Sequence, residues 1–293
     1  MNPAPLQPLS RAATVPSLRS ARVIARPLAR QKRRMPQLHK VEWSQVLPLM
    51  RQLQSLAESA APKGPFDTKP IDAFILGMFW RCVRLHRAAT ALLETSLPEE
   101  CTIIARSLFE ESLHLQELAD TPADRDALIL KWAKKSIHEK RGLIKDAQSL
   151  GLEVDPQPIF RALDDQQRDL DEYLRRHPVG KLRPFLSVRA AAVRYGRKDC
   201  YWTYAWSHEA VHGSDAAWLF ARRRVASDTV ALFARTDDPA LLIGFAAFAA
   251  RSLAEAVQAV CSIFGWSPPG DLRKLAEQID QAAEGAVCNR KDR

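Results

Sequence analysis

The stretch that decides the fold is residues 239–264, which reads PALLIGFAAFAARSLAEAVQAVCSIF. Its Ala, Leu and Phe content favours a helix, and because it is apolar nearly all round, we expect it to be the central helix of the protein. Its polar residues form a single stripe at helical spacing: Arg251, Glu255, Gln258 and Ser262. That stripe either faces solvent or is buried and paired with groups on neighbouring helices.

The rest of the chain has the same helix-forming composition. Of its 293 residues, 46% are hydrophobic and only 11 are glycine, and the Val, Ile and Thr alternation typical of strands is scarce. We therefore expect an all-α fold, a single bundle of about eight helices over residues 35–293. Expected helices, bounded by proline, glycine and polar capping residues, are 41–60, 70–95, 96–119, 125–150, 159–176, 201–219, 239–264 and 272–283.

Some boundaries depend on individual residues. Ser96-Leu-Pro-Glu99 has the form of a capping box, and Gly151 is placed to end the fourth helix. Pro156 and Pro158 indicate a connection before the helix at 159–176. Residues 229–234 are the one place where a short strand is conceivable.

Residues 1–34 differ from the rest of the chain. They contain eight Arg and Lys residues, several prolines and no acid, so the remainder carries a net charge of only +1 out of +9. We expect this segment to be disordered: a basic arm, an organellar transit peptide, or sequence preceding a true start at Met35, the interpretation we favour. The nearly neutral remainder gives no general nucleic-acid signature.

Cysteine and hydropathy patterns indicate a soluble cytoplasmic protein. The five cysteines are scattered and never form a Cys-x-x-Cys pair, which favours reduced, buried thiols. We find no signal peptide, and the apolar run 239–250 is interrupted by Arg251 and predicted to be too short to cross a membrane. No membrane partner is therefore expected.

Two polar stripes on predicted helices are candidates for a site. Tyr204, His208 and His212 are spaced four residues apart, so they share one helix face, and Asp215 follows three residues later. On the predicted third helix a second stripe runs through Arg106, Glu110, His114 and Glu117. We expect Arg106 and Glu110 to meet Tyr204 and His212 across the interior of the bundle.

Three roles for this cluster stay open. The two histidines, with Glu110, have the spacing to chelate a metal ion. Alternatively, His212 acts as a general acid or base, with Arg106 stabilising an anionic substrate. In the third interpretation, Tyr204 and the histidines are core polar groups that tie helices together. The sequence identifies no cofactor and leaves metal dependence and oligomeric state open.

The segment Ala105-Arg-Ser-Leu-Phe-Glu110, followed downstream by Tyr204-x-x-x-His208-x-x-x-His212-Gly213, resembles an uncharacterised family of bacterial all-helical domains, the domain-of-unknown-function family DUF5677. The likeness covers roughly residues 70 to 225. It implies that Arg106, Glu110, Tyr204 and His212 match the recurring polar residues of the family, whereas His208 stands where a small hydroxyl residue is expected. The family implies an all-helical fold and no established activity.

A second resemblance concerns helical prokaryotic ribonucleases of the HEPN type. Arg81-Cys-Val-Arg-Leu-His86 is similar to their Arg-and-His motif, and so is Arg34-Met-Pro-Gln-Leu-His39. In a chain this rich in arginine such matches are uninformative by themselves. The function expected from the sequence is a hydrolase acting on a phosphate-bearing substrate, RNA or a nucleotide, through Arg106, Glu110, Tyr204 and His212. The alternative is a non-catalytic interaction or regulatory module in which the same cluster is structural.

Overall fold

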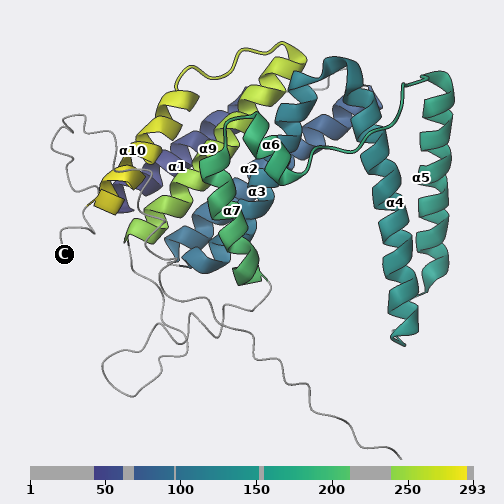
Figure 1. Ribbon diagram of the computed structural model, residues 1–293, viewed down its shortest axis with the longest axis horizontal. Helices are drawn as coiled ribbons and strands as arrows, with labels where there is room; N and C mark the ends of the chain where they lie inside the picture. Colours follow the sequence, from purple (N-terminus) through teal and green to yellow (C-terminus); the bar gives the residue numbers. More distant parts are fainter. Residues whose placement is uncertain (1–42, 62–68, 96, 152–154, 212–238, 289–293) are drawn as a thin grey trace, which may run out of the picture. The chain divides into compact units, whose positions relative to one another are not determined.

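Every regular element in the described part of the chain is helical, as the computed structural model shows (Figure 1). The structure describes residues 43–61, 69–95, 97–151, 155–211 and 239–288, all within one compact unit, Lys40–Arg293. These residues contain no strand and nine α-helices: α1 Trp43–Ala60, α2 Pro70–Glu94, α3 Pro98–Asp120, α4 Arg125–Ser149, α5 Pro156–Arg176, α6 Val188–Arg194, α7 Lys198–Val211, α9 Pro239–Phe264 and α10 Leu272–Cys288. The predicted all-α fold is confirmed.

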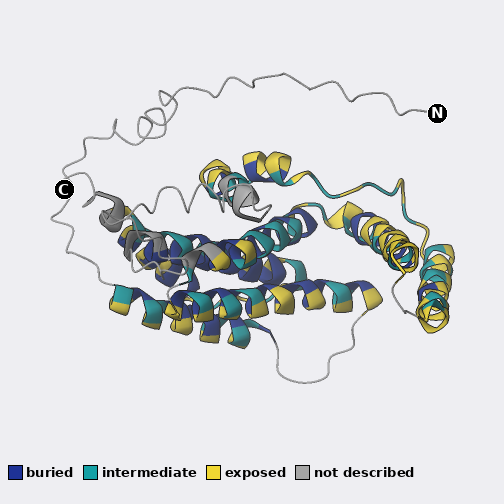
Figure 2. Ribbon diagram, turned by 90° about the horizontal axis from the view of Figure 1, so that it is seen from below, coloured by how far each residue is buried: buried dark blue, intermediate teal, exposed yellow. Residues whose placement is uncertain are grey.

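The helix α9 is the centre of the bundle, as its sequence predicted. It packs against α1, α2, α3 and α10, and dark blue in Figure 2 marks the buried residues inside the bundle. Ile243, Leu253 and Val257 are completely buried, and Phe248 meets Phe109 of α3 with ring centroids 5.3 Å apart. Burial of apolar side chains on this scale is the main stabilising contribution to such a bundle.

The length of α9 corrects one expectation from the sequence. Because the helix continues through Arg251, its segment Leu242–Phe264 is long and apolar enough to cross a membrane by length and composition alone. In the structure 67% of that window is buried inside the protein. The helix therefore has the burial of a core helix, which passes the same length and composition test as a membrane span.

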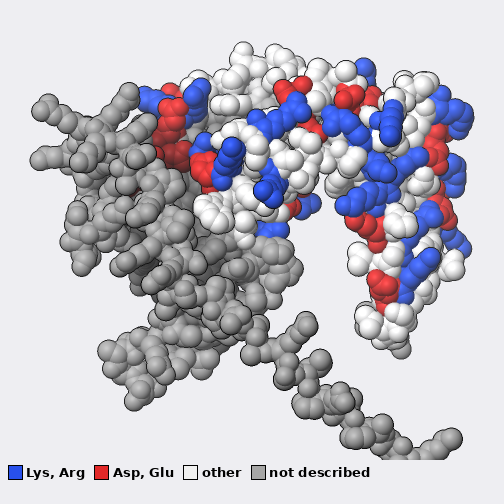
Figure 3. Space-filling model, in the orientation of Figure 1, with Lys and Arg blue, Asp and Glu red and all other residues white. Residues whose placement is uncertain are grey.

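The helices α4 and α5 lie side by side as an antiparallel pair beside the bundle (Figure 1). They share a small apolar core of Ile137, Ile144 and Leu163, and their outer faces carry mixed positive and negative side chains (Figure 3). The predicted connection at Pro156 and Pro158 is wrong, because α5 begins at Pro156 with Asp155 as its N-cap. Proline is tolerated in the first turn, where its missing N–H would have no helical partner.

Other boundaries agree with the sequence to within a few residues. Gly151, with a φ of 73°, follows α4 in the left-handed conformation expected of a C-terminal cap. The helix α3 begins at Pro98 with Leu97 as its N-cap, and Ser96 of the predicted capping box lies outside the described residues. The possible strand at 229–234 also lies outside them.

The described cysteines are consistent with the expected reduced thiols. Cys82, Cys101, Cys200 and Cys261 are all buried and free. Burial raises the pKa of the Cys101 thiol to about 12, so this thiol stays protonated at neutral pH. These side chains contribute to packing as small apolar groups.

Candidate functional site

Three residues of the predicted site converge between α3 and α7. Tyr204 Oη donates a hydrogen bond to Glu110 Oε1 at 2.5 Å and accepts one from Arg106 Nη2 at 2.8 Å. Arg106 Nε lies 3.6 Å from Glu110 Oε1, one helical turn along α3. The phenol thus joins a guanidinium and a carboxylate that the helix spacing already makes neighbours. We call these three residues the Arg106 cluster.

Ring contacts position Tyr204 in this cluster. Its ring lies 5.8 Å from that of Phe109 on α3 and 5.8 Å from that of Tyr201 on α7, measured between centroids. The guanidinium carbon of Arg106 stands 4.2 Å from the centroid of the same ring, within the range of a cation–π contact. Because Phe109 is fully buried, the core of the bundle holds one side of the cluster.

The cluster is only partly buried. The side chain of Arg106 is 18% exposed and that of Glu110 is 35% exposed, while Tyr204 is half-buried. Solvent therefore reaches the carboxylate and part of the guanidinium. A cluster with this exposure is accessible to a ligand, unlike a sealed polar knot in the core.

The environment of Tyr204 fixes its protonation state. Burial, followed by the hydrogen bond to Glu110, raises the pKa of the phenol to about 12, and Arg106 partly opposes the shift. At neutral pH Tyr204 is therefore a protonated hydrogen-bond donor and not a phenolate nucleophile. Its chemical capacity here is to orient the carboxylate of Glu110 and the guanidinium of Arg106.

The predicted histidines are only partly accounted for. His208 belongs to α7, which begins at Lys198, three residues before the predicted start. The helix is described as far as Val211, so His212, Asp215 and the side chain of His208 lie outside the described part. The convergence of Arg106 and Glu110 with Tyr204 is confirmed, and the participation of His212 stays a prediction.

Two titratable groups on α3 adjoin the cluster. Glu111 pairs with Arg81 of α2 at 3.2 Å, and burial raises its pKa. His114 packs against Phe185, with ring centroids 4.5 Å apart, and burial lowers the pKa of its imidazole against the opposing effect of Glu110. Sequence periodicity placed His114 on the polar stripe and left open whether the stripe is exposed or buried; in the structure His114 is half-buried.

A second polar network forms around Glu255 of α9. Gln116 Nε2 of α3 donates to its carboxylate at 2.5 Å, and the buried Arg197 pairs with the same group. Arg197 also donates to Cys200 Sγ at 3.1 Å, while Arg251 binds Asp199 at 2.6 Å. On the polar stripe of α9, Arg251 and Glu255 are therefore partly buried and paired, whereas Gln258 and Ser262 are exposed, so the stripe combines the two arrangements that the sequence left open.

Arg81 and His86, the two residues that match the HEPN-type motif, do not lie together in the structure. Arg81 is exposed and pairs with Glu111, whereas His86 is completely buried with Nδ1 2.8 Å from Gln54 Oε1. Burial lowers the pKa of His86 to about 3, so the ring is neutral. Positions five apart on a helix point in different directions, which accounts for the separation. The second match, Arg34 to His39, lies outside the described residues.

Metal ligation was the third possible role. Among the residues that the structure describes, no group of three or more His, Cys, Asp or Glu side chains is placed to hold a metal ion. The proposed ligand His212 lies outside these residues, so the metal alternative stays a prediction.

Comparison with known proteins places the chain in a family. Residues 72–225 match the model of a family of unknown function, DUF5677, and the chain belongs to that family. The matched segment contains Arg106, Glu110, Tyr204 and His212, as the resemblance of these motifs implied. No curated protein and no solved structure matches the chain.

Proposed function

We propose that the protein is a hydrolase acting on a phosphate-bearing or nucleic-acid substrate at the Arg106 cluster. In this proposal Arg106 binds the anionic group, Glu110 orients Arg106, and Tyr204 fixes both. His212 transfers the proton of the attacking water, a role that rests on its position eight residues after Tyr204. Water adds to phosphorus and the bond to the leaving oxygen breaks.

One observation carries this proposal: Arg106, Glu110 and Tyr204 converge in a cluster that solvent partly reaches. Tyr204 lies 94 residues from Glu110 in sequence, yet its hydroxyl bonds to both α3 side chains. The guanidinium, held by the phenol and 18% exposed, is a preorganised ligand for a phosphate oxygen. In the sequence His212 directly follows Val211, the last described residue of the helix that carries Tyr204.

A second candidate is a non-catalytic interaction or regulatory module. It is supported by the way that Arg106, Glu110 and Tyr204 satisfy one another and connect α3 to α7. In that case the cluster is a structural tie, and its removal lowers stability without removing any chemistry.

Substitutions within the cluster distinguish the two candidates. RNA and nucleotides are incubated with the protein and with the variants Tyr204→Phe, Arg106→Ala and His212→Ala, and product formation is measured beside thermal stability. Tyr204→Phe retains the ring and removes only the hydroxyl. A catalytic cluster predicts that each variant loses most of its activity, at least about tenfold, with a small change in melting temperature.

The matched control is Arg81→Ala, which removes another arginine paired with a glutamate of α3. It should keep full activity. If the wild-type protein releases no product from RNA or nucleotides, or if activity in the variants falls only in step with unfolding, the hydrolase proposal is wrong and the structural tie is favoured.

A further inference from the structure

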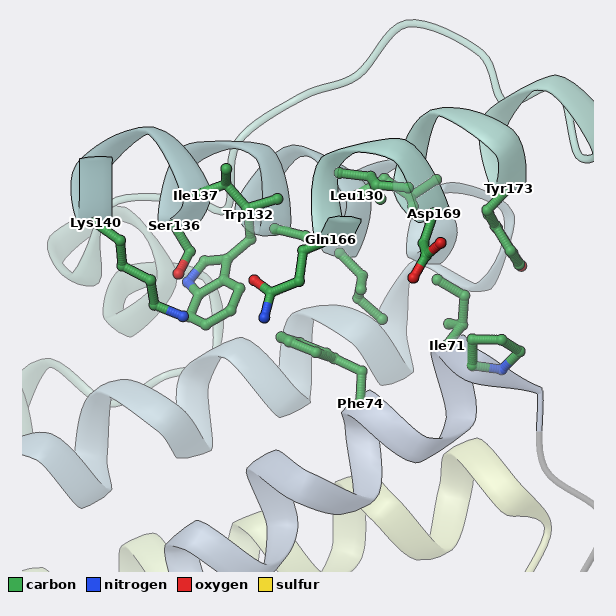
Figure 4. Close-up of a pocket in the computed structure, with 14 residues that line it drawn as sticks. Ile71, Phe74, Leu130, Trp132, Ser136, Ile137, Lys140, Gln166, Asp169 and Tyr173 are labelled. Atoms are coloured by element: carbon green, nitrogen blue, oxygen red, sulfur yellow. The ribbon is translucent and has the colours of Figure 1, made fainter. Parts of the chain in front are cut away.

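A pocket lies where α4 and α5 meet the start of α2 (Figure 4). Its volume is about 490 Å³, within the range that binds small molecules. Much of its wall is apolar, with Ile71, Leu130 and Ile137 among its lining residues. It shares no residue with the Arg106 cluster, which lies on α3 and α7.

Aromatic side chains line the middle of this pocket. Phe74 of α2 and Trp132 of α4 meet edge to face, with ring centroids 5.0 Å apart at 64°. Trp132 nevertheless remains 39% exposed, and Figure 4 shows both side chains directed toward the same space. An exposed indole in a concave apolar wall offers a surface on which a planar ring can stack.

Three of the polar side chains that line the pocket follow one another along it. In Figure 4 Lys140 lies beside Trp132 at one end, Gln166 extends toward Phe74 in the middle, and Asp169 lies toward the other end. Within the described part of the chain, the side chains of Lys140, Gln166 and Asp169 make no hydrogen bond and no ion pair. Their hydrogen-bonding groups are therefore available to a ligand.

Two ion pairs connect α4 to α5 outside the pocket. Lys134 pairs with Asp171 at 3.3 Å, and Arg141 pairs with Asp164 at 2.6 Å, in both cases between α4 and α5. Opposite charges thus meet across the helix pair beside the pocket, whereas Lys140 and Asp169 stay apart at the pocket itself. A ligand with an anionic group at one end and a donor group at the other complements that arrangement.

We propose that this pocket binds a purine nucleotide. The purine ring stacks on Trp132 against Phe74, and the amide of Gln166 both donates to and accepts from the base edge. The carboxylate of Asp169 accepts from the exocyclic amine of adenine, and the ammonium of Lys140 binds the phosphate. This site is distinct from the Arg106 cluster and does not depend on the proposed hydrolase activity.

Calorimetric titration of the full chain with adenosine monophosphate, adenosine and ribose 5-phosphate tests the proposal. Adenosine monophosphate should bind more tightly than either fragment. Lys140→Ala should weaken its binding about tenfold while adenosine binding stays within about twofold, because only the phosphate contact is lost. Asp169→Ala should weaken adenosine and adenosine monophosphate alike. Both side chains lie on the surface, so neither substitution removes a folding contact.

Matched controls use charges on the same helices outside the pocket. Lys145→Ala on α4 and Asp165→Ala on α5 should leave binding unchanged. Three outcomes would overturn the nucleotide pocket: no binding of adenosine monophosphate at millimolar concentration, equal binding of ribose 5-phosphate, or equal loss in Lys145→Ala and Lys140→Ala.

Discussion

At the scale of single residues, Tyr204 gives the most direct test of the Arg106 cluster. Its raised pKa of about 12 means that the folded protein holds the phenol protonated between pH 10 and 12, where an unfolded chain loses the proton. Because the raised pKa favours the neutral form, the stabilisation is complete below pH 10 and is lost as the pH rises through 12.

The absorbance of tyrosine changes when its phenol ionises, so an alkaline titration can be followed for the wild-type protein and for Tyr204→Phe. We predict that the difference between the two curves shows the ionisation of one phenol, with a midpoint near pH 12. The difference is needed because the chain has four tyrosines. The same pair of proteins in denaturant should give a midpoint near pH 10, the usual value for tyrosine. A native midpoint at or below pH 10 would contradict the burial of the phenol and its hydrogen bond to Glu110.

The burial of His86 should make the free energy of unfolding depend on pH in the acidic range. Burial lowers its pKa from 6.5 to about 3, so the folded state binds fewer protons than the unfolded state between these values. The stabilisation is present above pH 6.5 and decreases as the pH falls toward 3, by about 1.4 kcal/mol per pH unit. Gln54, whose carbonyl oxygen accepts from Nδ1, fixes the neutral tautomer.

The variant His86→Asn should be less stable than the wild type at pH 7 but lose less stability on acidification. Urea denaturation at pH 6.5, 5.5 and 4.5 measures the free energy of unfolding of both proteins. Their difference should shrink toward low pH, because only the wild type pays the protonation penalty at this position. Parallel pH dependence in the two proteins would show that His86 titrates normally in the folded state.

At the scale of elements, Glu117 anchors the connection before α6 to α3. Its side chain is 1% exposed, and it accepts from Leu186 N at 2.8 Å and from Arg183 Nη1 at 3.0 Å. Arg183 also reaches the exposed Asp124 at 3.1 Å. Arg183 thus contacts one buried carboxylate and one exposed carboxylate. Removing each carboxylate in turn therefore shows how much burial adds to the stabilisation that the ion pair provides.

We predict that Glu117→Ala lowers the free energy of unfolding by about 3 kcal/mol, since it leaves the partly buried N–H of Leu186 and part of a guanidinium without an acceptor. Asp124→Ala, which removes the exposed partner of the same arginine, should cost less than about 1 kcal/mol. Chemical denaturation measures both. Equal losses would mean that the connection is not held by the buried carboxylate.

The helices also show which features of the structure sequence periodicity can predict. It located α9 and the stripe of Arg106 and Glu110, because apolar residues at helical spacing mark the buried face of a helix directly. It did not identify Arg197 as the partner of Glu255. Arg197 follows Gly196, whose φ of 70° turns the chain between α6 and α7, and no periodic pattern extends across such a turn. Spacing identifies a polar face but not the distant residue that meets it.

At the scale of the whole molecule, charge is distributed unevenly along the sequence. Residues 1–34 carry eight positive charges and no negative ones, while the rest has a net charge of +1. On α4 and α5 positive and negative side chains alternate over the surface (Figure 3). Non-specific attraction to RNA should therefore depend on the N-terminal segment and not on the helical unit.

This separation predicts the effect of removing residues 1–34. The full chain should bind single-stranded RNA with a steep salt dependence, since each phosphate neutralised contributes a slope of about −0.7 in log K against log salt. The shortened chain should bind far more weakly and with a nearly flat salt dependence, yet keep the thermal stability of the full chain and any hydrolysis at the Arg106 cluster. Filter binding at several salt concentrations measures the first effect, and the product assay measures the second. Unchanged RNA binding after the truncation would instead show that the helical unit itself presents a basic surface to the phosphates.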